Sequence, residues 1–281
     1  MKKTISLIAA LILPLAAVAQ DAWPSRPISF VVPFPPGGPT DLMARLIAQP
    51  LSKRLNVPIV VENKAGASGM LGLKAMASAK ADGYTIGMIT VEITMMHHQK
   101  LTELDPTSFT PIALVNLDPA GFQVRADSPY KTMADLVAAY KADPTTFAIA
   151  GGGAVGSQDW MKGSLIAKAA DQDPKSMRYV ALEGGGAVLT ALEGGHVQVG
   201  SGDAAEMGKH HLAGKVRILA VMSPERLPGE LKDIPTAKEQ GFDIEWPVWR
   251  AFYVGKDVSD ADYEWWVNDY DTMSKTPEFY K

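Results

Sequence analysis

Residues 28–41 read ISFVVPFPPGGPTD, and residues 147–159 read FAIAGGGAVGSQD. Each stretch begins with a short apolar run, passes through a glycine-rich turn and leads into a segment with helical periodicity. A strand, a tight turn and a helix in this order are typical of parallel α/β sheets. Because the pattern occurs twice along the chain, we expect two α/β lobes of similar construction.

The segments that flank these two stretches match as well. The first set of predicted strands covers residues 28–34, 59–62, 85–90 and 111–115. The second set covers residues 147–150, 178–183, 197–201 and 216–222. The predicted helices cover residues 41–55, 70–79, 158–169 and a stretch that ends at 192. Each third strand is followed by a helical or irregular connection to the fourth.

Two extended apolar segments, 121–125 and 248–254, each follow a fourth strand. We interpret them as strands that the chain adds after it crosses from one lobe to the other, and two such crossings make a hinge. The first lobe is therefore expected to comprise residues 20–118 and 247–281, and the second lobe residues 119–246. A helix that begins near Asp260 is expected to pack back on the first lobe.

The N-terminus has the features of a secretory signal peptide over residues 1–19. Lys2 and Lys3 precede an apolar run that ends in an A-x-A triplet, which predicts cleavage near Ala19. The run is shorter than the ~20 residues that a membrane-spanning helix needs. We therefore expect an exported, soluble, periplasmic protein.

Charge and cysteine content exclude several classes of function. Removing the two signal lysines leaves 25 basic against 31 acidic side chains, a net charge of −6. An acidic protein lacks the basic footprint that nucleic acid recognition requires, so no nucleic acid partner is expected. The chain has no cysteine, which excludes disulfides, thiolate metal sites and a cysteine nucleophile.

The two glycine-rich turns are the best candidates for a binding site. In open α/β sheets, ligands bind beyond the carboxyl ends of the strands. Helix N-termini there attract anions through unpaired N–H groups and the helix dipole. Two such turns brought face to face by a hinge would clamp a carboxylate without any net positive charge.

The first turn combines rigidity with close backbone approach. Pro35, Pro36 and Pro39 lack N–H donors and stiffen the turn. We expect ligand contact from the flexible glycines and the residue that starts the helix, namely Gly37, Gly38 and Thr40. Asp41 is more simply explained as a residue that caps the helix, with ligand contact as the alternative.

The second turn also matches a dinucleotide-binding pattern. Gly151, Gly153 and Gly156 fit G-x-G-x-x-G between a strand and a helix, and Glu183 ends the next strand. This alternative would make the protein an enzyme with a nucleotide cofactor. The export signal and Asp159, which would oppose a pyrophosphate, argue against it. We instead interpret Ser157 and Gln158 as neutral donors to a carboxylate.

Three further residues are weaker candidates. Ser68 and Asp203 follow predicted strands, where they either face the ligand or belong to ordinary turns. Arg250 lies within an apolar run, and a buried arginine needs an anion. That anion is either an internal Asp or Glu or the carboxylate of a bound ligand.

The histidine pairs and the remaining motifs do not indicate chemistry. Side chains of adjacent residues such as His97 and His98, or His210 and His211, point apart on strands and helices, so solvated histidines are expected and no metal site. No G-x-S-x-G elbow occurs, and nothing pairs a nucleophile with a base. We therefore expect neither catalysis nor a cofactor.

Several segments carry a family likeness. VVPFPPGGPTD, VVENKAGASG and ADGYTIGM resemble the substrate-binding receptors of the tripartite tricarboxylate transporter family, also called the Bordetella uptake gene family. Segments such as VRADSPYKT and VRILAVMSPERLP extend the likeness across most of the chain. GSQDWM, YVALEGGG, GSGDAAEM and WRAFYVG look closest to the receptors for citrate and other tricarboxylates.

The resemblance implies a monomeric, two-lobed type II (Venus-flytrap) receptor that delivers a small carboxylate to a permease of one large and one small integral-membrane subunit. A further alternative is that the receptor serves a sensor kinase as well as transport. Citrate is the first expected ligand, before other tricarboxylates and C4 dicarboxylates. By position, the ligand-binding turns comprise Phe34, Pro36, Gly37, Gly38, Thr40 and Asp41 in the first lobe, and Gly153, Ala154, Val155, Gly156, Ser157 and Gln158 in the second.

Two features depart from the family pattern. The chain stops at Lys281, earlier than relatives usually do, so we expect the C-terminal part of the first lobe to be truncated. Pro39 replaces a small residue that many relatives have, which removes a backbone donor from the first turn.

Overall fold

The computed structural model describes residues 23–280. The signal peptide predicted for residues 1–19 lies outside the described residues, and its cleavage near Ala19 stays a prediction. Within residues 23–280, no helix is both long enough and apolar enough to cross a bilayer.

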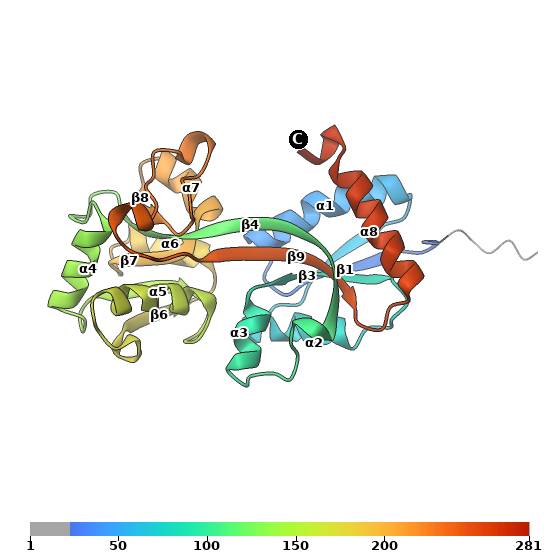
Figure 1. Cartoon of the computed structure of the whole chain (residues 1–281), viewed down its shortest axis with the longest axis horizontal. Helices are drawn as coiled ribbons and strands as arrows, with labels where there is room; N and C mark the ends of the chain where they lie inside the picture. The colour runs from blue at the N-terminus through green and yellow to red at the C-terminus, as the bar shows by residue number, and fades with distance from the viewer. Residues whose placement is uncertain (1–22, 281) are drawn as a thin grey trace, which may run out of the picture.

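The first lobe is built on parallel strands with helices packed against them (Figure 1). Strand β1 (Ile28–Val32) lies between β2 (Ile59–Asn63) and β3 (Thr85–Thr90), and both neighbours run parallel to it. The helices of this lobe are α1 (Pro39–Leu55), α2 (Met70–Ala77), α3 (Glu92–His98) and α8 (Asp260–Ser274). Helix α8 packs on this lobe through Trp266, whose indole N–H donates to the Gly83 carbonyl at 3.0 Å.

The second lobe repeats this construction with a core of its own. Strand β5 (Ala148–Gly152) lies between the parallel strands β6 (Arg178–Leu182) and β7 (Val199–Asp203). Strand β8 (Val216–Val221) is also in this lobe, with the helices α4 (Met133–Ala142), α5 (Gln158–Ala169), α6 (Gly185–Glu193) and α7 (Ala204–Leu212). Short 3-10 turns cover Ala67–Gly69, Pro106–Ser108, Pro174–Ser176, Gly229–Leu231, Lys238–Gln240 and Pro277–Tyr280.

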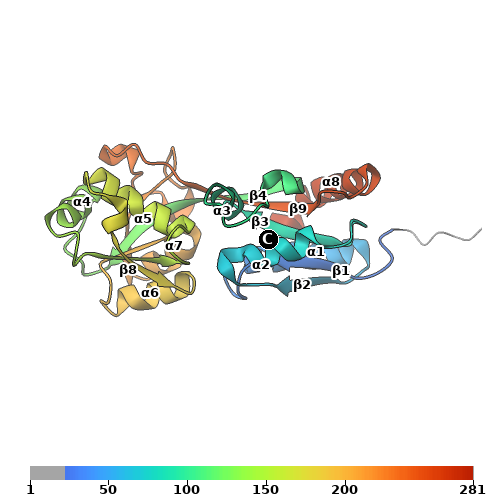
Figure 2. The same ribbon diagram turned by 90° about the horizontal axis from the view of Figure 1, so that it is seen from below.

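Two long strands, β4 (Phe109–Arg125) and β9 (Pro247–Gly255), lead from one lobe to the other. Figure 2 shows the lobes side by side with these strands between them. Along residues 109–119, β4 pairs antiparallel with β9, and along residues 120–125 it pairs with β7 and β8. One strand therefore belongs to the sheets of both lobes, and the two-lobed α/β fold predicted from sequence is observed.

The prediction of separate strands over 111–115 and 121–125 was wrong, because β4 is continuous. Pro111 and Pro119 argue locally against a continuous strand, since proline cannot donate to a sheet ladder. The strand accommodates them by register shifts between Pro111 and Ala113 and between Leu114 and Asn116. The lobe boundaries predicted after 118 and 246 fall inside β4 and directly before β9, and they stay predictions.

The remaining differences concern the ends of elements and the connections. Strand β1 ends two residues before its predicted end at Phe34, and α1 begins at Pro39 instead of Asp41. Strand β7 covers 199–203 instead of 197–201. The connections after the third strands are helices α3 and α7, and α4 had not been predicted.

Candidate functional site

The first turn is held closed by the carboxylate of Asp41. This side chain is 2% exposed and accepts hydrogen bonds from the Gly37 N–H at 2.8 Å, Asn63 Nδ2 at 2.9 Å and Arg45 Nε at 3.0 Å. Burial alone would raise the pKa of Asp41, but the bonds from Arg45, Gly37 and Asn63 lower it below its usual value. Asn63 also donates to the Phe34 carbonyl at 3.0 Å. Asp41 therefore stabilises the turn, but the prediction that it caps the helix was wrong, because Gly38 is the N-cap of α1 and no side chain caps this helix. Ligand contact by Asp41 stays a prediction.

The same turn leaves backbone donors free. Helix α1 begins at Pro39 with Gly38 as its N-cap and without a capping side chain. In the described part of the chain, no acceptor bonds the N–H groups of Gly38, Thr40 or Asp41. Gly37 adopts a φ of 85°, which a side chain would strain. Pro36 is exposed, and Phe34 packs on the core of the first lobe.

The second turn is shaped by Ser157, the N-cap of α5. Its hydroxyl accepts from the Trp160 N–H at 3.3 Å and donates to the Gly152 carbonyl at 3.2 Å. Asp159 accepts from the Gly152 N–H at 2.7 Å. Both side chains therefore make internal contacts at the start of the helix.

The tip of the second turn presents unpaired N–H groups. Ala154 and Val155 are exposed, and among residues 23–280 no acceptor bonds the N–H of Ala154, Val155 or Gly156. Gly153 adopts a φ of 89°, and Tyr179 donates to its carbonyl at 3.2 Å. The two turns therefore share the feature that an anion-binding site requires, a group of free backbone donors at a helix start.

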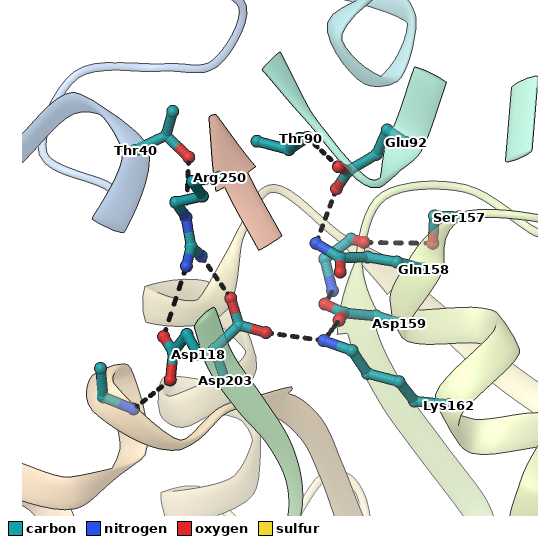
Figure 3. Close-up of polar contacts among 12 residues, drawn as sticks. Thr40, Thr90, Glu92, Asp118, Ser157, Gln158, Asp159, Lys162, Asp203 and Arg250 are labelled. Atoms are coloured by element: carbon teal, nitrogen blue, oxygen red, sulfur yellow. Dashed lines mark hydrogen bonds and ion pairs between the residues drawn. The ribbon is translucent and has the colours of Figure 1, made fainter. Parts of the chain in front are cut away.

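A buried ion cluster lies between the lobes, as Figure 3 shows. Arg250 Nη2 lies 2.5 Å from Asp203 Oδ2, and Arg250 Nη1 lies 3.5 Å from Asp118 Oδ2. Lys162 Nζ lies 2.7 Å from Asp203 Oδ1 and 2.8 Å from Asp159 Oδ1. Arg250 Nε also donates to the Thr40 hydroxyl at 3.3 Å. The structure thus supplies Arg250 with internal anions, one of the two possibilities that the sequence left open.

Burial, together with the neighbouring charges, shifts the pKa values of the carboxyl groups in and beside this cluster. Burial raises the pKa of Asp118 to about 6, and the charge of Asp203 adds to that shift. Burial likewise raises the pKa of Glu206 to about 7, with contributions from Asp203 and Asp159. Burial would also raise the pKa of Asp203, but the cations Lys162 and Arg250 outweigh it and lower the pKa.

Residues of the first lobe lie next to the second turn. Gln158 Nε2 donates to Glu92 Oε1 at 2.6 Å, and Gln99 Nε2 donates to the Gly156 carbonyl at 2.6 Å. The Ser68 hydroxyl lies 3.8 Å from the position that a β-carbon on Gly153 would take. The predicted candidates Ser68, Gly153 and Gln158 are therefore brought to one place.

Sequence reasoning missed several members of this region, namely Asn63, Glu92, Gln99, Asp118 and Lys162. Lys162 carried a usable signal, because it shares the apolar face of α5 with Ile166 and follows Asp159 by three residues. Asp118 carried no usable signal, since the surrounding residues Asn-Leu-Asp-Pro are typical of a turn. Its role depends on pairing with β9, which is distant in sequence.

The histidines differ from expectation at three positions. His98 is exposed, but His97 is half-buried and its Nδ1 has no partner among the described residues. His211 is also half-buried and accepts from the Ile218 N–H at 3.2 Å. His210 is half-buried too, and its Nδ1 lies 3.5 Å from Glu193 Oε1. Across residues 23–280, no group of three or more His, Cys, Asp or Glu side chains is arranged to hold a metal ion.

Comparison with known families decides the class of the protein. The sequence pattern described as "Tripartite tricarboxylate transporter family receptor" matches residues 43–279. The chain belongs to this family. A relative from Agrobacterium vitis, the UPF0065 protein in the TAR-I ttuE-ttuC' intergenic region, is 34% identical over 257 residues, covering 90% of this chain and 72% of the relative.

Solved structures of similar proteins agree with this assignment. The periplasmic binding protein BugD superimposes with a TM-score of 0.81 at 27% identity, covering 92% of this chain and 86% of that chain. MatC from Rhodopseudomonas palustris, with bound malate, gives 0.81 at 25% identity, covering 92% and 87%. An R. palustris protein with adipate gives 0.82 at 26% identity, covering 92% and 86%. The family resemblance and the periplasmic binding protein fold predicted from sequence are confirmed.

Proposed function

We propose that this tripartite tricarboxylate transporter family receptor is exported to the periplasm and captures a small organic carboxylate between its two turns. The observation that carries the proposal is the presence of free backbone donors at the starts of α1 and α5, one helix in each lobe. N–H groups and helix dipoles at these positions favour anions without a positive side chain. An acidic protein is thereby able to bind an acidic ligand.

A ligand with a carboxylate at each end suits this arrangement. One carboxylate accepts from the turn of the first lobe and another from the turn of the second, while β4 and β9 allow the lobes to close. The proteins solved with malate and adipate show that similar receptors hold acids of this kind. Citrate is our first choice, before other tricarboxylates and C4 dicarboxylates.

The ligand-bound receptor then delivers the acid to a membrane permease of one large and one small subunit, driven by an ion gradient. The contacting residues are those of the two turns, Phe34 to Asp41 and Gly153 to Gln158, with Ser68 beside them. Asp203 and Arg250 act behind the site, because they are paired with each other and with internal partners. The receptor acts as a monomer.

An enzyme with a nucleotide cofactor is the rival function. The position of Asp159 argues against it, because this buried carboxylate accepts from the Gly152 N–H at the start of α5, where a pyrophosphate would bind. Titrating NADH while following its fluorescence separates the two functions. Saturable micromolar binding of NADH would favour the enzyme.

A thermal-shift panel of acids tests the proposal directly. The purified protein is melted with citrate, other tricarboxylates, malate, succinate and adipate, and with glucose as a neutral control. A ligand at a hundred times its dissociation constant adds about 2.7 kcal/mol of stability. We expect a clear rise in melting temperature with at least one acid and none with glucose. If no acid moves the melting temperature of folded protein, the proposal fails.

A further inference from the structure

Helix α3 of the first lobe contacts the second turn, which belongs to the other lobe. Gln158 Nε2 donates to Glu92 at the start of this helix, and Gln99, directly after its last residue, donates to the Gly156 carbonyl. Both bonds are 2.6 Å long and join residues that lie 66 and 57 positions apart. They are made at Gly156 and Gln158, at the C-terminal end of the turn whose free N–H groups face the proposed ligand.

Glu92 is held in place for this contact. It is 7% exposed, and its second carboxyl oxygen accepts from the Thr90 hydroxyl within the same lobe. The remaining oxygen is the acceptor for Gln158. Gln158 is the first residue of α5, so a bond to its side chain helps to fix where the helix and the preceding turn begin.

The charges around Glu92 come from both lobes. Lys162 on α5 and Asp203 on β7 act on it from the second lobe, and Arg250 on β9 lies near it from the crossing strand. Burial raises the pKa of Glu92, Asp203 raises it further, and the bond from Thr90 and the charge of Lys162 oppose the rise. The net direction is upward, so the neutral form of Glu92 is favoured when the lobes are together.

We propose that α3 is a positioning element for ligand capture, in which Glu92 and Gln99 hold the second turn in the closed arrangement without touching the ligand. This inference rests on the proposed receptor function. Both bonds join residues of different lobes, so opening of the lobes would break them. The apparent affinity of a receptor scales with the fraction of molecules in the binding-competent state. Loss of either bond therefore weakens binding, because it lowers the fraction of molecules in the binding-competent state.

Affinity measurements on four variants test the role of α3. Calorimetry with citrate, or with malate or adipate where the thermal panel selects one of these, is run on Glu92→Ala, Gln99→Ala, Glu92→Gln and Glu103→Ala. We expect Glu92→Ala and Gln99→Ala each to weaken binding roughly three- to tenfold, the effect of one hydrogen bond. Glu92→Gln keeps an oxygen acceptor for Gln158 and should bind as the parent does at a pH below the raised pKa of Glu92. Glu103 is exposed on the following loop, so its variant is the matched control.

The distance between the lobes provides a readout that does not need a ligand. The chain has no cysteine, so spin labels at Lys74→Cys on α2 and Lys168→Cys on α5, both exposed, report only on the lobes. In ligand-free protein, Glu92→Ala and Gln99→Ala should shift the distance distribution toward longer values. Gln99 is exposed, so its variant stays folded even if Glu92→Ala does not.

The pH dependence separates a positioning role from a general effect on folding. Closing the lobes favours the neutral form of Glu92, so affinity should fall as pH rises through its raised pKa, and Glu92→Gln should lack that part of the fall. Equal pH profiles in parent and Glu92→Gln would contradict the neutral Glu92. Unchanged affinity and unchanged distances in both alanine variants would overturn the proposal. If no acid binds the parent protein, the proposed receptor function fails. The spin-label distances measured without ligand still test the role of α3.

Discussion

The guanidinium of Arg250 lies 2.5 Å from the carboxylate of Asp203, an ion pair that joins crossing strand β9 to the carboxyl end of β7. The same guanidinium approaches Asp118 on the other crossing strand at 3.5 Å. Arg250 is 3% exposed, so these carboxylates and not water balance its charge. The buried ion cluster therefore lies where the two crossing strands pass from one lobe to the other.

Replacing Arg250 should strongly destabilise the protein. Arg250→Met leaves Asp118 and Asp203 short of a buried cation, and breaking one side of a buried pair costs about 3 to 5 kcal/mol. Urea unfolding measures the loss. The control is Arg226→Met, which removes an exposed pair with Glu239 at 2.9 Å and should cost under about 1 kcal/mol. Equal losses in the two variants would show that the cluster does not stabilise the fold.

Glu206 should make stability depend on pH. Its pKa is raised to about 7, chiefly by burial, and its carboxyl lies against Gly185 at the start of α6. A carboxyl with a raised folded-state pKa contributes stability that is complete below the unfolded pKa, near 4.3, and is lost as pH rises through about 7.

The test compares free energies of unfolding at pH 5 and pH 8. The parent should lose on the order of 2 to 3 kcal/mol more than Glu206→Gln over this interval, because each pKa unit is worth about 1.4 kcal/mol. Glu230→Gln, on an exposed residue, should behave as the parent does. A Glu206→Gln protein with the parent's pH dependence would rule out a titrating Glu206.

The order of strands and helices was predictable because each element carries a local signal. Strand β5 and helix α5 are separated by a turn whose glycines have positive φ, and this need is visible in the sequence. The continuity of β4 was not predictable, because Asn116 and Asp118 suit a turn. Pairing with β9, 130 residues away at Asp118 and Val248, makes them part of a strand.

The same distinction applies to the candidate site, where some residues were predictable from local sequence and others were not. The two turns were identifiable from sequence, because the residues that leave backbone donors free at the start of a helix are neighbours in the chain. The buried partners of Arg250 and the contact between Glu92 and Gln158 depend on how the lobes meet. No pattern within one segment encodes that meeting. A single arginine in an apolar run indicated only that some anion must lie nearby.

Ser157→Ala tests whether the hydroxyl is a cap or a ligand contact. Its oxygen accepts from the Trp160 N–H, and the hydroxyl donates to the Gly152 carbonyl. We therefore expect a loss of about 1 kcal/mol in stability, the usual cost of an N-cap, and less than a threefold change in ligand affinity. Thermal melting and calorimetry on the same variant measure both. A tenfold loss of affinity with unchanged stability would place the hydroxyl on the ligand instead. Ser164→Ala on the same helix is a suitable control, because its hydroxyl donates to the Met161 carbonyl within the same helix.

Lys162 offers the sharpest test of the ion cluster, because its side chain is fully buried and its ammonium lies between Asp159 and Asp203. Lys162→Met keeps the length of the side chain and removes the charge, which leaves two buried carboxylates with one fewer cation. We expect a loss of about 3 to 5 kcal/mol in the free energy of unfolding. Lys168→Met, on the exposed face of the same helix, should change it by less than about 0.5 kcal/mol.

Adding Asp159→Asn to Lys162→Met should recover part of that loss. Asparagine keeps an oxygen for the Gly152 N–H, which bonds Asp159 at 2.7 Å, and it removes the unpaired charge. Asp203 keeps Arg250 as its cation, so the double variant contains no buried carboxylate without a partner at this position. Residues in one ion network show coupling energies of about 0.5 to 3 kcal/mol, so the two changes should not add. If the double variant is less stable than Lys162→Met by the full cost of Asp159→Asn alone, Lys162 and Asp159 are not coupled and the cluster is only a set of neighbours.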